Sequence, residues 1–154
     1  MAAIKSIVED LQTHSGLDVM RMMMNEGEAS PMGDLLGLEI VGVEDGKVTI
    51  EATPQVQFYN PLLRIHGGYT ATLIDTAMGS AVFTKMHVGQ GAGTVVLNIN
   101  YVGKIEVETG KLTIIGQVLH SGRTMLTAEA QVRDSNGKLL AHGTGTFLVY
   151  PKSA

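Results

Sequence analysis

The feature that most constrains the fold of this chain is a long apolar helix, which the sequence predicts from Gly67 to about Met86. Proline does not interrupt the segment, because Pro61 is the only proline between Pro54 and Pro151. Its apolar side chains cover more than one face; they are Tyr69, Leu73, Ile74, Ala77, Met78, Ala81 and Val82. A helix that is apolar nearly all round is usually buried, so we expect the rest of the chain to fold around it.

One formal charge interrupts this helix. Asp75 is the only charged residue between Arg64 and Lys85. The threonines and serine nearby are compatible with burial, because their hydroxyls can bond back to the helix backbone. Burying a carboxylate without a partner is energetically costly. We therefore expect Asp75 to be catalytic; the alternative is a structural aspartate that caps a neighbouring backbone segment.

The glycine pair Gly67-Gly68 begins the helix, where backbone N–H groups are free and the helix dipole is positive. Such amides can polarise a carbonyl or hold an oxyanion, and a thioester carbonyl is a suitable target. The alternative is a tight turn that requires small residues. Gly67 and Asp75 lie about 12 Å apart along one helix, so they serve the same carbonyl only if Asp75 comes from a second subunit.

The segment HGGYTATLIDTAMGSA, residues 66–81, resembles the HGG…D signature of the hotdog-fold acyl-CoA thioesterases, in the phenylacetate-pathway (PaaI-like) group. The spacing from Asn60 to Gly67 and on to Asp75 is also similar, and the resemblance covers about residues 33–150. It implies an α+β hotdog fold, in which an antiparallel β-sheet wraps around the long central helix. It also implies a homodimer with antiparallel helices and shared active sites, and a homotetramer built as a dimer of dimers.

The same resemblance implies the reaction and several residue roles. An acyl- or aryl-CoA thioester would be hydrolysed to the free acid and coenzyme A, without a metal or redox cofactor. Asp75 would act as a general base on water or attack the carbonyl itself, and the sequence does not choose between these. The resemblance suggests a polar contact from Asn60 and a water-orienting hydroxyl from Thr94. For His66, a loop-ordering bond and a direct catalytic role both remain open.

Coenzyme A carries phosphates, so basic residues should line the nucleotide end of the site. The candidates are Arg64, Lys104, Arg123 and Lys152. Arg123 follows Ser121-Gly122 and resembles a recurring family position; the alternative is an ordinary exposed turn arginine. The predicted substrate-binding residues are Gly68, Arg64, Ser121 and Arg123.

Composition excludes several other classes of function. The chain has 154 residues, 44% of them hydrophobic and 17% charged, which is typical of one globular domain. A net charge of −4 argues against nucleic acid as a partner. No cysteine is present, so disulfides, thiolate metal sites and a cysteine nucleophile are excluded. The histidines lack metal-ligand spacing, and neither a membrane span nor a signal peptide is evident, so we expect a cytoplasmic protein.

Residues 1–30 are predicted as an N-terminal helical extension that precedes the hotdog domain of residues 31–154. Within residues 2–26 two apolar stripes separated by Ser15-Gly16 fit helical spacing; they are Ile4, Ile7, Val8 and Leu11, then Leu17, Met20, Met23 and Met24. The methionines suggest either a flexible lid over an acyl chain or a helix packed on the body or on another subunit.

The remaining segments predict an antiparallel sheet. Residues 28–33 form a linker, and residues 38–52 form a hairpin around the turn pair Asp45-Gly46. After the helix, residues 87–93 form a glycine-rich loop without the ending of a phosphate-binding loop. Strands of alternating polarity follow at residues 94–102, 111–120, 124–133 and 139–149.

Two details of these strands are specific enough to test. Val95, Leu97, Ile99 and Tyr101 are expected on one face of the first strand. Gly143 and Gly145 in the last strand suggest a close backbone approach.

Three other functions remain as alternatives to a thioesterase. The first is a non-catalytic acyl-CoA-binding protein of the same fold, against which Asp75 argues, since binding alone needs no carboxylate there. The second is a hotdog dehydratase or hydratase, whose Asp/His pattern is absent from this chain. The third is a purely structural oligomer. Release of free thiol from a panel of acyl-CoAs discriminates among them.

Overall fold

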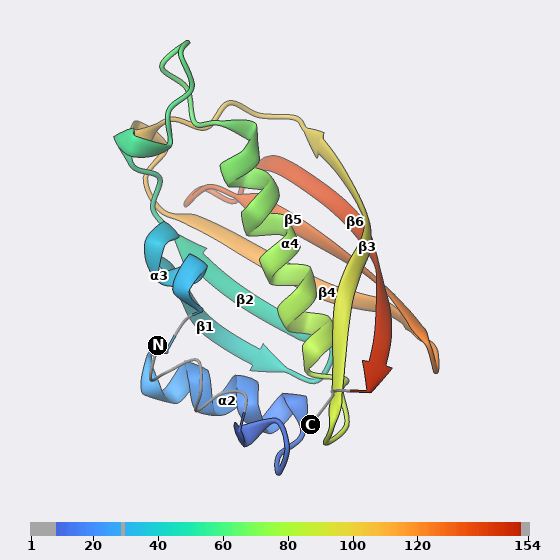
Figure 1. The fold of residues 1–154 in the computed structure, drawn as a ribbon. Coiled ribbons are helices and arrows are strands. Elements are labelled where there is room, and N and C mark those ends of the chain that lie inside the picture. The colour runs from blue at the N-terminus through green and yellow to red at the C-terminus, as the bar shows by residue number, and fades with distance from the viewer. Residues whose placement is uncertain (1–8, 29, 152–154) are drawn as a thin grey trace.

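A computed structural model describes residues 9–28 and 30–151 of the chain. Figure 1 shows one curved sheet wrapped around helix α4 (Gly67–Phe83), with helices α2 (Gly16–Glu26) and α3 (Pro31–Leu36) beside the sheet. The strands are β1 (Leu38–Glu44), β2 (Lys47–Ala52), β3 (Gln90–Tyr101), β4 (Leu112–Ser121), β5 (Met125–Arg133) and β6 (Leu139–Pro151). All pairings are antiparallel, in the order β1-β2-β4-β5-β6-β3. The predicted α+β architecture is confirmed.

Helix α4 is the centre of the hydrophobic core, as its apolar sequence predicted. Leu73, Ile74 and Ala77 are each no more than 1% exposed. The helix ends at Phe83 rather than near Met86. Its end is fixed by the Thr84 hydroxyl, which donates to the Ala81 carbonyl at 2.6 Å and accepts from the Gly46 amide at 2.7 Å.

Two glycines let the sheet pack closely, one against the backbone of α4 and the other against β3 and the Ile74 side chain. A Cβ atom at Gly116 of β4 would overlap the Ala77 carbonyl group. A Cβ at Gly143 of β6 would lie 2.6 Å from the Asn98 carbonyl oxygen and 2.9 Å from Ile74. The close approach predicted at Gly143 is therefore confirmed, and Gly116 adds a tighter one.

The N-terminal helix α2 packs on the body of the molecule. Ser15 caps it, with Oγ accepting from the Asp18 amide at 3.2 Å, and the Gly16 amide donates to the Met86 carbonyl at 2.9 Å. Val19 and Met20 are buried. The packed-helix interpretation is therefore confirmed for α2. The predicted face of Ile4, Ile7 and Val8 lies outside the described residues.

The linker predicted at residues 28–33 is wrong in its second half, because α3 begins at Pro31. Ser30 is its N-cap, accepting from the Gly33 amide at 3.1 Å, and proline suits the first helical position.

The glycine-rich loop predicted at residues 87–93 is also partly wrong, since β3 begins at Gln90. Gly91 pairs with Tyr150 of β6, and a Cβ there would lie 2.9 Å from the Tyr150 ring. Glycine at this position therefore makes room for an aromatic ring and does not mark a loop. A register shift between Thr94 and Val96 leaves Val95 without a paired residue, so it does not continue the face predicted with Leu97.

Strand β3 is one edge of the sheet, and the middle of this strand carries exposed apolar side chains. Val95, Val96 and Leu97 are 52%, 45% and 38% exposed. Unpaired edge strands with apolar side chains are ready sites for pairing with another chain. Among the described residues, no helix is long and apolar enough to cross a membrane.

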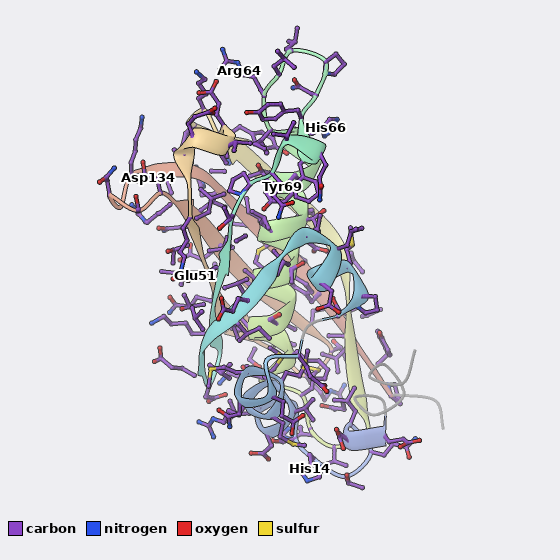
Figure 2. The ribbon with its side chains drawn as sticks, turned by 90° about the vertical axis from the view of Figure 1, so that its left-hand side faces the viewer. His14, Glu51, Arg64, His66, Tyr69 and Asp134 are labelled. Carbon is purple, nitrogen blue, oxygen red and sulfur yellow. The ribbon has the colours of Figure 1, made fainter. Side chains whose placement is uncertain are left out.

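Tyr69 provides a test of the core. It lies below His66 in the first turn of α4 (Figure 2), is 5% exposed, and stacks on Phe58 with ring centroids 4.6 Å apart. Within the described part of the chain its hydroxyl has no hydrogen-bond partner. Replacing Tyr69 with Phe should raise the free energy of unfolding by about 1 kcal/mol in urea titrations, because a desolvated hydroxyl is removed. Tyr59→Phe is the matched control and should destabilise, since the Tyr59 hydroxyl accepts from the Val107 amide.

The advantage of Tyr69→Phe should also grow in alkali. Burial raises the pKa of Tyr69 to about 12, from an ordinary value of 10.0. Between these values the folded chain retains a proton that the unfolded chain has released, so stability is lost as pH rises through this window. Urea titrations at about pH 9 and about pH 11 should show a larger gap at the higher value. A gap that stays constant or shrinks contradicts the burial of the phenol.

Candidate active site

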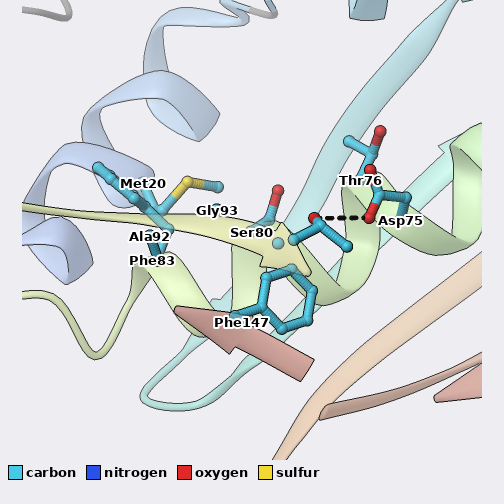
Figure 3. A pocket seen from close by; sticks show the side chains of 10 residues that line it. Met20, Asp75, Thr76, Ser80, Phe83, Ala92, Gly93 and Phe147 are labelled. Atoms are coloured by element: carbon cyan, nitrogen blue, oxygen red, sulfur yellow. Dashed lines mark hydrogen bonds between the residues drawn. The ribbon is translucent and has the colours of Figure 1, made fainter. Parts of the chain in front are cut away.

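Asp75 and Thr94 come together on the side of α4 that faces the edge strand β3. The Thr94 hydroxyl donates to Asp75 Oδ1 at 2.9 Å, drawn as the dashed line in Figure 3. Asp75 is half-buried in the chain, not fully buried and unpaired as its apolar helix suggested. The strand therefore supplies the polar partner that the helix lacks, and the carboxylate keeps further acceptor capacity for a water or a substrate.

An open cavity of about 330 Å³ surrounds this pair, and we call it the Asp75 cavity. Its walls come from α4 and β3, with Phe147 of β6 and Met20 of α2 at its sides (Figure 3). The contribution of Met20 means that the N-terminal extension reaches the candidate site.

The N-terminal end of α4 lies elsewhere and has its own geometry. His66 is the N-cap, and its Nδ1 accepts from the Gly68 amide at 2.8 Å, which leaves the ring proton on Nε2. The hydroxyl of Tyr101 donates to the Gly67 carbonyl at 3.0 Å. Among hydrogen bonds of the described residues, none uses the Gly67 amide. One amide of the glycine pair, not two, is thus available for a ligand.

Asn60 shapes the loop that leads into α4. Its Oδ1 accepts from the amides of Leu62 at 2.9 Å and Arg64 at 3.2 Å. Leu63, between them, has φ of 57°, which is unusual for a branched side chain. The contact that the resemblance assigned to Asn60 would therefore have to come from its Nδ2 group.

A second open cavity of about 360 Å³ lies at this end of the helix, and we call it the Gly67 cavity. Asn60, Gly67 and Tyr101 line it together with Arg64 and Lys104. Both cations pair with one carboxylate, Glu106, at 2.8 Å and 2.6 Å respectively. The cluster keeps a net positive charge, which suits an anionic group.

Other predicted residues line neither of these two cavities. Ser121 and Arg123 are at the β4–β5 turn, at the opposite end of the sheet from the Asn60 loop (Figure 1). Arg123 lines a separate cavity with Tyr150. Lys152 lies outside the described residues. In the part of the chain that the structure describes, no cluster of three histidine or acidic side chains is placed to hold a metal ion.

The two halves of the predicted site are therefore separate within one chain. Gly67 and Asp75 are on the same continuous helix, about 12 Å apart by its rise, and they open into different cavities. Tyr101 is the contributor that sequence analysis missed as a site residue. Its only signal in the sequence was its place on one face of the predicted strand with Leu97 and Ile99.

The chain is similar to known proteins in sequence and in fold. A model of the family described as the thioesterase superfamily matches residues 64–141. A solved structure of a conserved protein from Pseudomonas aeruginosa is 31% identical, with a TM-score of 0.74, and covers 81% of this chain and 98% of that one. Human acyl-coenzyme A thioesterase 13 is 29% identical over 110 residues, which are 71% of this chain and 77% of that protein.

The fold is also that of the Escherichia coli PaaI protein from the phenylacetic acid degradation operon. The two structures agree with a TM-score of 0.77 over 90% of this chain and 96% of that one, at 21% identity. The hotdog fold implied by the sequence resemblance is therefore confirmed.

The cap at His66 can be tested apart from any activity. His66→Ala should lower the free energy of unfolding by about 1 kcal/mol, because the Gly68 amide loses its acceptor. His66→Asn is the matched control and should retain most of the stability, since asparagine is a preferred N-cap. Urea titrations measure both variants. An alanine variant as stable as the wild type would show that the cap contributes nothing.

Proposed function

This chain belongs to the thioesterase superfamily, and we propose that it hydrolyses an acyl- or aryl-CoA thioester to the free acid and coenzyme A. The observation that carries the proposal is the carboxylate of Asp75, held by the Thr94 hydroxyl at 2.9 Å in an open cavity. The name of the human relative, an acyl-coenzyme A thioesterase, supports the substrate class.

In the general-base route, Asp75 takes a proton from water while the water oxygen bonds to the thioester carbonyl carbon. The carbonyl π electrons move to its oxygen, and the Gly67 amide stabilises the resulting oxyanion. When the oxyanion collapses, the C–S bond breaks, and the leaving thiolate of coenzyme A takes the proton back from Asp75. Thr94 keeps the carboxylate oriented, and its oxygen can accept a hydrogen bond from the same water.

In the nucleophilic route, an oxygen of Asp75 bonds to the carbonyl carbon and the C–S bond breaks. This step gives a mixed anhydride on Asp75 and the thiolate of coenzyme A. Water then attacks the anhydride and breaks its C–O bond, which releases the acid and restores the carboxylate, and the remaining proton of the water goes to the thiolate to give coenzyme A. The carboxylate accepts a single hydrogen bond from Thr94, and this geometry suits either route, so both stay open.

Either route needs Asp75 and the Gly67 amide at one carbonyl, and we propose that a homodimer supplies them from different chains. The exposed apolar edge of β3, which also carries Thr94, is a suitable contact. Antiparallel association would lay the start of α4 beside the middle of the partner's helix. It would also bring Arg64 and Lys104 of one chain toward the end of the partner that carries Arg123. A dimer of dimers extends this arrangement, and sedimentation at micromolar concentration tests both.

A non-catalytic acyl-CoA-binding protein remains the second candidate. It would use the Gly67 cavity with its basic residues but would not need the pair of Asp75 and Thr94. Thiol release from a panel of acyl-CoAs, with binding measured in parallel, separates the two functions. Binding without thiol release would favour the second.

Asp75→Asn should reduce kcat by about 100-fold to 10,000-fold, because the amide can neither take a proton nor attack the carbonyl. Its thermal midpoint and its affinity for acyl-CoA should stay close to the wild type, since the two side chains have nearly the same size. Glu26→Gln is a matched control at an exposed position of α2. Thiol release and melting curves are measured together, and near wild-type turnover of Asp75→Asn would end the catalytic assignment.

Complementation between two inactive variants tests the two-chain site. A Cβ at Gly67 would lie 3.4 Å from the Tyr101 ring, so alanine is tolerated there, whereas Gly67→Val should press on Tyr101 and block the amide. Gly67→Val and Asp75→Asn should each be inactive as homodimers. Random mixing makes about half of all dimers mixed, each with one of its two sites intact. About a quarter of wild-type activity should therefore return in the whole mixture, and about half in the isolated mixed dimers.

The mixed species is isolated by two different tags after co-expression, and Gly67→Ala serves as the control for a change at this position. Well-folded mixed dimers without activity would mean that both groups act from one chain.

A further inference from the structure

A smaller cavity adjoins the Asp75 cavity and extends beneath the N-terminal helices. It has a volume of about 90 Å³ and lies between α2, α3, β1, β2 and α4. We call it the N-terminal cavity. Its wall shares Met20, Thr76 and Ser80 with the Asp75 cavity, and Figure 3 shows Thr76 beside Asp75, with Ser80 and then Met20 farther away. The two cavities are therefore neighbours, with Met20, Thr76 and Ser80 between them.

The chemistry of the lining suits a hydrocarbon. Met23, Leu38, Ile40 and Ile50 supply apolar walls, hydroxyls come from serine and threonine, and no charged side chain is among the lining residues. Such a lining would not hold the phosphates of coenzyme A, whose natural place is near Arg64 and Lys104 in the Gly67 cavity. The acyl portion of a thioester is the part of the substrate that matches it.

Size restricts what can enter. An apolar cavity of about 150 Å³ binds benzene, so 90 Å³ holds a smaller group unless the wall moves. The wall that can move is methionine, which is unbranched and adapts its shape. Met20 is 4% exposed and fixed in the core, whereas Met23 is only half-buried. Met23 is thus the adjustable part of the wall.

We propose that the N-terminal cavity receives the end of the acyl group, and that α2, through Met20 and Met23, restricts the enzyme to short or compact acyl groups. The inference rests on the proposed thioesterase function. The two methionines and α3 precede residues 64–141, the part that the family model matches, so this side of the cavity wall lies outside the matched segment.

The test is the chain-length profile of kcat/KM over saturated acyl-CoAs from butanoyl to dodecanoyl. The wild type should prefer the shorter members. Met23→Ala enlarges the cavity and should raise the ratio of kcat/KM for long over short acyl groups by about tenfold or more. Ser80→Leu fills the shared wall and should shift the preference in the opposite direction. Met24→Ala is the matched control, because Met24 is on the same helix but does not line the cavity.

Circular dichroism and melting curves establish that each variant folds. Profiles of Met23→Ala and Ser80→Leu that match the wild type would overturn the inference while leaving the thioesterase function intact. If the wild type hydrolyses no acyl-CoA, the proposed function fails, and calorimetric binding of thioether analogues of the same length series tests the cavity alone. The same shift in preferred length on Met23→Ala supports the inference there, and no shift overturns it.

Discussion

The structure depends on direct contact between the backbone of α4 and the sheet. At Gly116 the strand lies so close to Ala77 that any side chain would overlap the helix carbonyl, and at Gly143 a side chain would press on the Ile74 side chain of the helix. Close packing of this kind fixes both the position and the rotation of a helix, since a small shift would create overlaps on one side and gaps on the other. Every group that α4 carries is therefore presented in a defined direction.

That constraint explains how an aspartate can sit in so apolar a helix. The glycine contacts turn one face of α4 onto the middle of the sheet, and Asp75 then faces the edge strand, where Thr94 donates to it. The N-terminal end of α4 lies away from Asp75, and hydrogen bonds from the Gly68 amide to His66 and from the Tyr101 hydroxyl to the Gly67 carbonyl fix its position. One rigid element thus carries two chemical groups at a separation that neither can change, which is why a complete site would require a second chain.

The sequence predicted the elements whose signals are local. The apolar helix, the turn at Asp45-Gly46 and the alternating strands β4 and β5 all have short-range patterns, and the structure confirms them. The sequence also singled out Asp75 as a candidate functional residue, because burying a carboxylate in an apolar helix without a partner is energetically costly. The resemblance suggested only a water-orienting hydroxyl at Thr94; its hydrogen bond to Asp75 was not predicted, because no rule of spacing joins residues that far apart in the sequence.

The predictions that were wrong share one cause, which is that a residue type typical of loops also serves in strands and at helix starts. Gly91 looked like part of a loop, but it makes room for the Tyr150 ring inside a strand. Ser30-Pro31 looked like a linker, but it starts a helix of one and a half turns whose only strong signal is that pair. Asn60 was expected to make a polar contact near the carbonyl or the water, and for His66 a loop-ordering bond was one of two open roles; in the structure the acceptor atoms of both are used by neighbouring amides. In each case the role of the residue depends on which group it contacts, and the residue type alone does not specify that contact.

The division between rigid and adaptable parts bears on how such a protein sets its substrate range. The groups with candidate chemical roles lie on α4 and β3, which are fixed by glycine contacts and by the sheet. The wall that would meet the end of an acyl group comes from α2, where the half-buried side chain of Met23 can change shape without moving the helix. Changes in α2 can therefore alter which acyl group fits while Asp75, Thr94 and Gly67 keep their geometry. An N-terminal extension is a favourable place for specificity, because the demands on catalysis and on acyl fit then fall on different elements.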